Sequence, residues 1–191
     1  MVNYFEIKNS ISGKFWSFAL RLVGGNVGKS VRIVSPLKLK NVNRIFIEDK
    51  VVVNKHSWLQ VEEKCGILEI GSGSVFGHFN HIYAYKSIKI GKKVLTADKV
   101  YISDCSHRYT DLNTPIMDQP VIELKAVVIG DHTWLGENVV VLGACVGKHC
   151  VIGSNSVVVK DIPDYCIAVG SPARIIKRFD ATTQIWVKVS D

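Results

Sequence analysis

An aliphatic residue followed by a small one returns every six positions along most of this 191-residue chain. The clearest examples are Ile129-Gly130, Leu135-Gly136, Val146-Gly147 and Ile152-Gly153. Within each hexad, another small or apolar residue falls four positions after the first, so the spacing alternates between four and two. Residues two apart share one face of a strand, whereas a spacing of four requires a corner between them. This pattern does not fit an α-helix, whose apolar residues recur every 3.6 positions.

The hexads group into coils that begin near residues 27, 47, 70, 90, 129 and 146. Three hexads make about 18 residues, so each coil has three short flat sides. Stacked coils pair as parallel strands about 4.8 Å apart and place their aliphatic side chains inside. The repeat therefore predicts an all-β fold, a triangular parallel solenoid.

The coil from 90 to 129 is longer than the others, and its extra residues fall at 103–122. This segment is polar, contains Pro115 and Pro120, and includes His107. An insertion of this length without secondary structure is uncommon in a compact domain unless it has a function. We expect a loop that protrudes from a rigid scaffold, which is a common location for a site.

The two ends of the chain lack the hexad pattern, so we expect a helical cap at 1–26, the solenoid at 27–179 and a strand or tail at 180–191. The N-terminal segment carries a helical apolar stripe made of Ile7, Ile11, Phe15, Phe18 and Leu22. We expect this stripe to cover the open end of the first coil. The alternative is a peripheral contact with a membrane surface. The C-terminal segment RFDATTQIWVKV predicts a short strand after a turn, anchored by Trp186.

Composition narrows the classes of partner. Lys and Arg number 24 against 17 Asp and Glu, an excess that suits an anionic ligand or surface. The chain has no zinc-finger spacing, no aromatic RNP pattern and no long basic helix, so we expect no nucleic-acid partner. It has no apolar run of about 18 residues, no signal-peptide pattern, and five cysteines without C-x-x-C spacing. We therefore expect a cytoplasmic protein with reduced thiols.

The segments VVIGDHTWLGENVV and CVIGSNSVVVKDIPDYCIAVGSPARIIKRF resemble the C-terminal half of hexapeptide-repeat acyltransferases. Three features carry the resemblance: the W-[IL]-G hexad, IG-x-x-S-V-V-x-K-D-I-P, and G-x-P-A-R-x-I. The similarity is to the galactoside, maltose and xenobiotic O-acetyltransferase group, and closest to its members in bacterial polysaccharide biosynthesis. It extends over 27–179 and is strong from residue 70 onward.

This resemblance implies a left-handed β-helix, a homotrimer, and acetyl-CoA as co-substrate lying between neighbouring subunits. It implies transfer of acetyl to the hydroxyl of a saccharide acceptor, with a histidine as general base and no covalent acyl-enzyme. The alternatives are N-acetylation of an amino sugar, acetylation of a xenobiotic or antibiotic, and a solenoid scaffold without catalysis. The sequence does not identify the acceptor.

His107 matches the catalytic histidine of the resembling enzymes, and imidazole suits base catalysis because its pKa lies near neutrality. Its alternative is a solvated loop residue, and neighbouring Cys105 need not act as a nucleophile. Asn80, in GHFNH, matches an asparagine that lines the acceptor and acetyl site; its alternative is a polar residue stacked inside the solenoid. Asp104 is expected to orient acceptor hydroxyls or the imidazole, or to be a turn residue.

The resemblance also assigns residues to the cofactor. Small residues at positions where backbone groups meet the pantetheine arm are Gly136, Ala144, Gly153 and Ser154. Basic residues at positions that meet the phosphates are Lys160, Arg174 and Lys177. Trp134 faces outward and is expected to lie near the active site, covered by a cofactor cleft or a subunit interface. Val159 and Glu137 depart from the residues that many members carry, which makes those two contacts doubtful.

The HFNH segment raises a metal alternative through His78 and His81. Residues three apart on a strand point to opposite faces, and no third ligand is evident. A catalytic zinc site requires three protein ligands, so we expect no metal.

Overall fold

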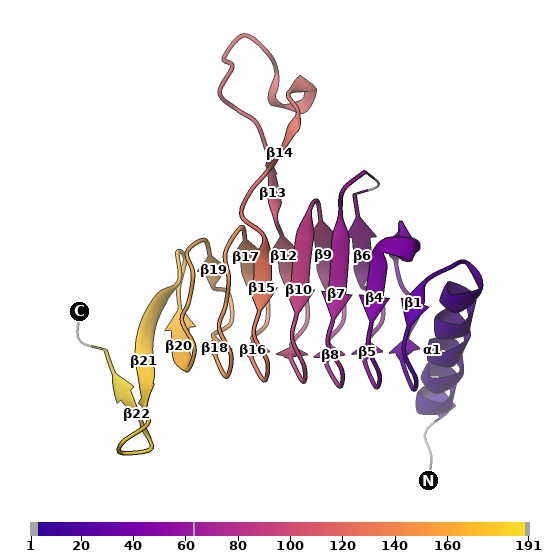
Figure 1. Cartoon of the computed structure of the whole chain (residues 1–191), viewed down its shortest axis with the longest axis horizontal. Coiled ribbons are helices and arrows are strands. Elements are labelled where there is room, and N and C mark those ends of the chain that lie inside the picture. The colour runs from indigo at the N-terminus through magenta and orange to yellow at the C-terminus, as the bar shows by residue number, and fades with distance from the viewer. Residues whose placement is uncertain (1–3, 63, 190–191) are drawn as a thin grey trace.

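The computed structural model describes residues 4–62 and 64–189, which form helix α1 (Tyr4–Leu22) followed by a three-sided prism (Figure 1). Strands of successive coils pair in parallel, and the last strands of the second sheet pair antiparallel. The first sheet consists of β1 (Asn26–Val27), β4 (Ile45–Ile47), β7 (Ile67–Ile70), β10 (Ser87–Ile90) and β15 (Val127–Ile129). The second sheet consists of β2 (Arg32–Ile33), β5 (Val52–Val53), β8 (Val75–Phe76), β11 (Leu95–Thr96), β16 (Trp134–Leu135), β18 (Val151–Ile152), β20 (Cys166–Val169), β21 (Arg174–Asp180) and β22 (Ile185–Lys188). The third sheet consists of β3 (Lys38–Lys40), β6 (Trp58–Val61), β9 (His81–Ala84), β12 (Tyr101–Ser103), β17 (Val140–Leu142) and β19 (Val157–Val158).

The chain visits the three sheets in a fixed order, so each coil contributes one strand to each face of the prism. From the N-terminal end, it passes down the front sheet, across the bottom sheet and up the rear sheet, which makes the coil left-handed (Figure 1). Successive coils pair in register, as Ile70 with Ile90 and Ile90 with Ile129 show. The predicted left-handed solenoid is therefore confirmed.

The interior is a continuous stack of aliphatic side chains with small polar residues at the corners. Ile90, Ile102 and Leu135 are among the inward residues that are almost completely buried. At the corners, the Ser74 hydroxyl donates to the Gly91 carbonyl at 2.9 Å, and the Thr133 hydroxyl donates to the Gly147 carbonyl at 2.7 Å. These bonds satisfy backbone groups that the corner would otherwise leave buried without a partner, which explains why the corners take small hydroxyl residues.

Helix α1 caps the first coil as predicted, but with the opposite face from the one expected. Among the helix residues whose side chains are described, 11–22, the buried ones are Gly13, Ser17 and Leu20, and the Ser17 hydroxyl donates to the Val31 carbonyl at 2.8 Å. A Cβ atom on Gly13 would lie 3.1 Å from the Cβ of Arg32, so small residues allow the helix backbone to approach the coil closely. This close contact explains why the small face, rather than the apolar stripe, is buried.

The described part of the predicted stripe, Ile11, Phe15, Phe18 and Leu22, points away from the prism and is exposed. The side chain of Ile7 lies outside the described residues. Among the described residues, no helix combines the length and the apolar character needed to span a bilayer.

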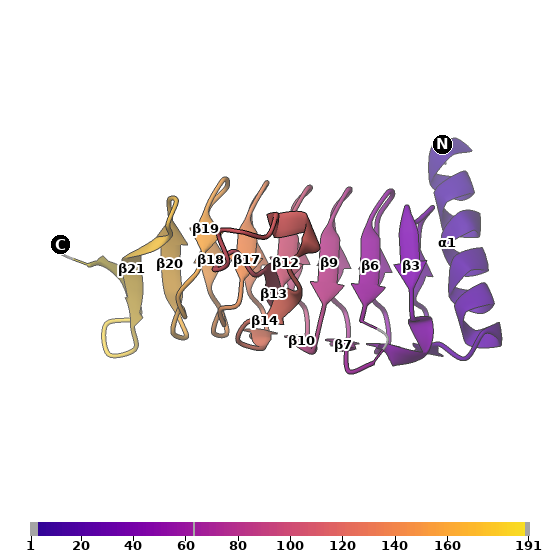
Figure 2. The ribbon, with the colours of Figure 1, turned by 90° about the horizontal axis from the view of Figure 1, so that it is seen from above.

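The segment inserted in the fourth coil forms an ordered protrusion. Strands β13 (Cys105–His107) and β14 (Val121–Glu123) pair antiparallel, with Cys105 opposite Glu123. A 3₁₀ helix, η2 (Ile116–Asp118), lies at its tip; the other 3₁₀ helix, η1 (Val42–Arg44), precedes β4. Figures 1 and 2 show the β13–β14 hairpin standing clear of the prism near the middle of its length. The predicted protrusion is confirmed, and its base is a hairpin.

Candidate active site

His107 ends β13 and lies exposed at the foot of the β13–β14 hairpin. It lines a cavity of about 260 Å³, which we call the hairpin pocket. The other lining residues are Tyr83, Tyr101, Cys105, Ser106, Val121 and Leu142. No described residue hydrogen-bonds the His107 imidazole, so both ring nitrogens are available to ligands. The structure thus places the predicted base in a pocket between the hairpin and the third sheet.

Asp104 holds the foot of the hairpin in place. Its carboxylate is fully buried and accepts hydrogen bonds from the backbone N–H groups of Tyr85, Lys86 and Ser87, at 2.6, 2.8 and 2.6 Å. Its own carbonyl accepts a bond from the N–H of Leu124 at 2.8 Å, where the chain returns from the hairpin. These contacts favour a positioning role three residues before His107, because the carboxylate faces backbone groups and not the pocket.

Two walls of the hairpin pocket, Tyr83 and Cys105, stay protonated and uncharged near neutral pH. Burial raises the pKa of Tyr83 to about 12, and the negative charge of Glu62 adds to this effect. The Tyr83 hydroxyl also donates a hydrogen bond to the Glu62 carboxylate at 3.2 Å. Burial raises the pKa of the Cys105 thiol, so this residue is a poor nucleophile. This geometry agrees with the expectation that Cys105 forms no acyl-enzyme.

A row of aromatic side chains leads along the third sheet to the hairpin pocket. Trp58, His81 and Tyr101 occupy the same register on β6, β9 and β12. The Trp58 and His81 rings stack at 4.3 Å between centroids, and the His81 and Tyr101 rings lie 5.1 Å apart. The Lys38 ammonium lies 4.6 Å from the Trp58 ring. Burial lowers the pKa of His81, and the charge of Lys38 lowers it further, so the imidazole is neutral near pH 7.

This aromatic row was not predicted from the sequence, in which His81 was considered only as a possible metal ligand. The signal that could have found it is the recurrence of ring-bearing residues at matching positions of successive coils, 58, 81 and 101. Outward positions on stacked strands form ladders in the same way as inward ones.

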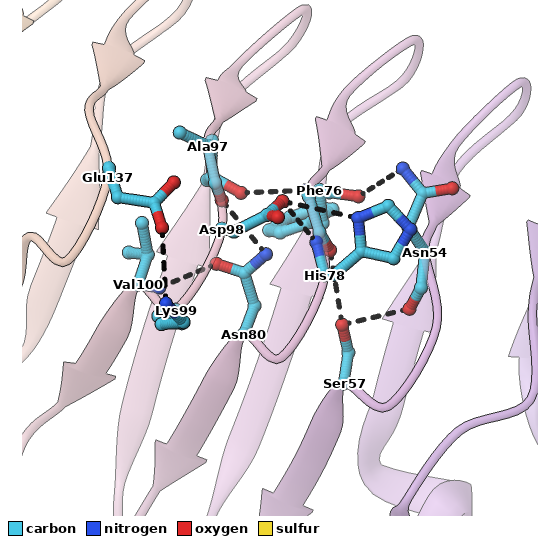
Figure 3. Close-up of polar contacts among 12 residues, drawn as sticks. Asn54, Ser57, Phe76, His78, Asn80, Ala97, Asp98, Lys99, Val100 and Glu137 are labelled. Atoms are coloured by element: carbon cyan, nitrogen blue, oxygen red, sulfur yellow. Dashed lines mark hydrogen bonds and ion pairs between the residues drawn. The ribbon is translucent and has the colours of Figure 1, made fainter.

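Asn80 is 1% exposed and lies inside the corner that follows β8. Its amide donates to the Ala97 carbonyl at 3.2 Å, and its carbonyl oxygen accepts from the Val100 N–H at 3.1 Å (Figure 3). Both ends of the side-chain amide thus bond the backbone of the next coil. These contacts favour the structural alternative for Asn80, a polar residue that joins two coils, over contact with an acceptor.

His78 lies at the same corner but at the surface. Its Nδ1 is 3.3 Å from an oxygen of Asp98, and both side chains are almost half exposed (Figure 3). His81 lies on β9 in the aromatic row, so the two histidines of HFNH have separate surroundings. Within the part of the chain that the structure describes, no group of three His, Cys, Asp or Glu side chains could hold a metal ion.

The predicted cofactor residues divide between two corners of the prism. Trp134 is 47% exposed on the second sheet, and Gly136, Gly153 and Ser154 follow that sheet at the corner toward the third. A Cβ on Gly136 would lie 2.8 Å from the Ser154 backbone nitrogen, so packing between coils by itself accounts for this glycine. Ala144 and Lys160 instead follow β17 and β19, at the corner from which the hairpin leaves. The predicted cofactor residues therefore do not share one corner of the protomer.

Arg174 and Lys177 lie on the outer face of the second sheet despite being three residues apart on β21. Arg174 pairs with Val169, and Lys177 pairs with Ile167, because a bulge interrupts the pairing between Ile167 and Ala168. In regular alternation, two residues three apart would face opposite sides. The bulge brings both cations to the side of the prism that carries Trp134.

Comparison with known proteins places these features in a family context. Residues 126–160 match the family model for bacterial transferase hexapeptide (six repeats). Rv3034c of Mycobacterium tuberculosis, named as a probable acetyltransferase, is 41% identical over 155 residues, which cover 79% of this chain and 49% of Rv3034c. WbbJ of Escherichia coli, named for lipopolysaccharide biosynthesis O-acetyl transfer, is 38% identical over 130 residues, which cover 64% of this chain and 66% of WbbJ. The chain thus spans about half the length of the first relative and just under two thirds of the second.

Solved structures with low sequence identity share the fold. AntD, an N-acyltransferase from Bacillus cereus in complex with dTDP and 3-hydroxybutyryl-CoA, has a TM-score of 0.73 at 20% identity, covering 87% of this chain and 89% of AntD. The hexapeptide-repeat acetyltransferase VCA0836 from Vibrio cholerae, in complex with acetyl coenzyme A, has a TM-score of 0.61 at 22% identity, covering 92% and 82%. The predicted resemblance to hexapeptide-repeat acyltransferases is confirmed, and this chain carries the bacterial transferase hexapeptide repeat on a left-handed parallel β-helix.

Proposed function

We propose that this protein is an acetyl-CoA-dependent O-acetyltransferase that acts on a sugar hydroxyl, with His107 as general base. The observation that carries the proposal is the exposed His107 imidazole at the hairpin pocket, held there by a hairpin that interrupts an otherwise regular solenoid. The named activities of Rv3034c and WbbJ support acetyl transfer, and the name of WbbJ supports oxygen as the acceptor atom.

The reaction needs few protein groups. The His107 imidazole takes the proton of the acceptor hydroxyl as its oxygen forms a bond to the thioester carbonyl carbon. The carbon–sulfur bond then breaks, and the departing thiolate receives that proton from the imidazolium. The products are the acetyl ester and free CoA. No acetyl group is transferred to Cys105, because burial raises the pKa of its thiol and keeps it protonated.

The aromatic row supports a saccharide as the acceptor. Pockets that bind small molecules are usually lined by aromatic and apolar side chains with a few polar groups. Tyr101 belongs both to the row and to the hairpin pocket, so a sugar lying on Trp58 and His81 would extend toward His107. The neutral state of His81 suits contact with an uncharged ring.

We also propose that the enzyme works as a homotrimer with cofactor sites between protomers. The hairpin exposes Tyr109, Leu112, Ile116 and Met117, which is unusual for apolar side chains at the surface of a monomer. The predicted cofactor residues occupy two different corners, so a neighbouring protomer would be needed to bring one set toward the other. A cyclic arrangement of three-sided prisms provides such contacts.

A cytoplasmic location fits this proposal. All five cysteines are free, with no disulfide between them. Burial raises the pKa of Cys150 to about 11, as expected of a reduced thiol packed in the interior. Free thiols of this kind are typical of a reducing compartment.

The test is release of free thiol from acetyl-CoA in the presence of a panel of neutral sugars and amino sugars. We expect release with at least one neutral sugar, and we expect His107→Ala to lower kcat by about a hundredfold or more, the usual scale of base catalysis. Mass spectrometry of the product, with mild alkaline hydrolysis to remove esters but not amides, separates O-acetyl from N-acetyl transfer.

The matched control is His149→Asn, a substitution of another exposed histidine distant from the hairpin pocket. The backbone of His149 has the left-handed conformation (φ 50°), which asparagine tolerates. We expect this variant to keep normal turnover. Equal turnover of wild type and His107→Ala would refute the role of His107. An alkali-stable product would favour the N-acetylation alternative, and AntD is an N-acyltransferase with a similar fold.

A further inference from the structure

The outer face of α1 is an exposed apolar stripe that no described part of the protomer covers. Ile11, Phe15, Phe18 and Leu22 are between 57% and 71% exposed, and Val23 extends the stripe beyond the helix. We call these five residues the α1 stripe. Figures 1 and 2 show α1 lying across the end of the prism. The exposure of the stripe side chains means that they lie on the side of the helix away from the first coil. A contiguous apolar surface of this kind indicates an interaction site.

Positive charge concentrates at the same end of the molecule. Residues 7–47, which build most of α1 and the first coil, contain no Asp or Glu. Their basic residues are Lys8, Lys14, Arg21, Lys29, Arg32, Lys38, Lys40 and Arg44. This segment therefore carries a charge of +8, whereas the remaining 16 basic and 17 acidic residues of the chain sum to −1. The whole positive excess of the protein lies at the end that exposes the α1 stripe.

The described side chains leave this charge largely without carboxylate partners. Lys14 and Arg21 are exposed on the helix, and no ion pair among the described residues involves either of them. The Arg21 guanidinium donates to the carbonyls of Val27 and Gly28, which fixes the side chain without neutralising it. The α1 stripe is thus flanked by cations whose charge no described carboxylate neutralises.

We propose that this end of the solenoid docks on an anionic lipid membrane, with the α1 stripe inserted among the lipid chains and the flanking cations against the headgroups. An apolar helix face bordered by Lys and Arg is the pattern of interfacial helices, and each cation near an anionic leaflet adds to the attraction. A second copy of this chain fits the end less well, because a two-fold pairing would set its basic residues against the same cations.

Docking by this end leaves the rest of the molecule accessible. Helix α1 terminates the prism, whereas the β13–β14 hairpin leaves the side of the fourth coil (Figure 1). The hairpin pocket lies between this hairpin and the third sheet. Coils stack about 4.8 Å apart, so β12 lies roughly 15 Å along the prism from β3. Membrane contact therefore does not cover His107, and the inference is independent of the proposed catalysis.

The test is cosedimentation of the full chain with vesicles of phosphatidylglycerol and phosphatidylcholine in equal parts, and with vesicles of phosphatidylcholine alone. We expect binding to the anionic vesicles that weakens as salt is raised, since salt screens the charges. Phe15→Ser/Phe18→Ser should reduce the binding constant at least tenfold, because the variant loses the transfer of two phenylalanine rings from water into lipid. Lys14→Glu/Lys29→Glu should reduce binding to the anionic vesicles only.

Matched controls come from two regions outside α1 and the first coil, namely β10 and the C-terminal strand β22. Ile185→Ser/Val187→Ser removes two exposed apolar side chains of β22, and Lys89→Glu/Lys188→Glu reverses two exposed charges distant from α1. We expect these variants to bind as wild type does, with thermal unfolding confirming that all variants are folded. Absence of binding to anionic vesicles, or equal binding of the Phe15/Phe18 variant, overturns the proposal. Sedimentation velocity in the absence of lipid that shows the Phe15/Phe18 variant to be smaller than wild type would assign the surface to self-association instead.

Discussion

The stacked coils bury their apolar side chains, whereas the β13–β14 hairpin exposes them to solvent. Inward residues of the coils such as Ile102, Ile129 and Leu135 are completely buried. At the hairpin tip, Leu112 is 95% exposed and Met117 is 85% exposed. The coils therefore gain their stability from the interior of the prism, whereas the tip contributes little to the folding of a single protomer.

This difference separates scaffold from site. Side chains in the interior are fixed by the coils above and below, which leaves no room for a ligand. The hairpin departs from this arrangement, and its foot contributes His107 to the hairpin pocket. The rigid repeat therefore holds the site residues in place. The hairpin that interrupts the repeat carries the candidate catalytic group and an exposed surface that a partner could cover.

The largest effect predicted by this contrast concerns two leucines given the same substitution. Leu135→Ala empties a fully buried position and should lower the free energy of unfolding by about 3–5 kcal/mol. Leu112→Ala removes a side chain in solvent at the hairpin tip and should change it by less than about 0.5 kcal/mol. Urea unfolding followed by circular dichroism measures both, at protein concentrations low enough to disfavour oligomers. A large cost at Leu112 under those conditions would mean that the tip is part of the folded core.

A smaller effect is expected at the junction between coil and hairpin. Asp104→Ala leaves the buried N–H groups of Tyr85, Lys86 and Ser87 without their acceptor, which should cost about 2–3 kcal/mol of unfolding free energy. It should also lower kcat with little change in the KM for acetyl-CoA, because the foot of the hairpin that carries His107 loses its attachment. Asp104→Asn keeps one acceptor oxygen and should recover part of both losses.

The control for Asp104 is Asp111→Ala at the hairpin tip. Asp111 is exposed, and its carboxylate accepts hydrogen bonds from the near neighbours Asn113 and Thr114, at 2.9 and 2.7 Å; the bond from Gln119 goes to its backbone carbonyl, which alanine keeps. We expect a negligible effect on unfolding and on kcat. If Asp104→Ala and Asp111→Ala behaved alike, the hairpin would be held by something other than the buried carboxylate.

The regular part of this structure could be predicted from the sequence because the hexad expresses a purely local rule. Each coil requires an aliphatic residue inside and a small residue at the turn. Ile102 fills the first kind of position, and Gly71 fills the second, where a Cβ would lie 2.5 Å from the next coil. The cap was harder, since both faces of α1 carry plausible packing residues. The face with Gly13 and Ser17 is buried because its small residues let the helix backbone approach the first coil closely. The spacing of apolar residues along the helix does not reveal this contact.

The candidate site was predicted less completely for a related reason. His107 could be found from the break in the repeat and from family resemblance. The partners of its pocket, Tyr83 and Tyr101, come from other coils, and their positions follow only from the register between strands. Asn80 and Asp104 show the converse: both types of residue suit a binding site, yet their polar groups are engaged with backbone in the corners.

The smallest predicted effect tests whether the coils, and not only the hairpin, contribute to ligand binding. Arg174→Glu should raise the KM for acetyl-CoA about tenfold while leaving kcat nearly unchanged, because a phosphate contact binds ground state and transition state alike. Arg178→Glu makes the same charge change on the same strand, but Arg178 pairs with Cys166 on the other face of the sheet. It should therefore raise KM far less. Equal effects on KM would show that the overall charge of β21 attracts the phosphates, whichever face of the strand carries it. The outer face created by the bulge would then not be a specific phosphate site of the coils.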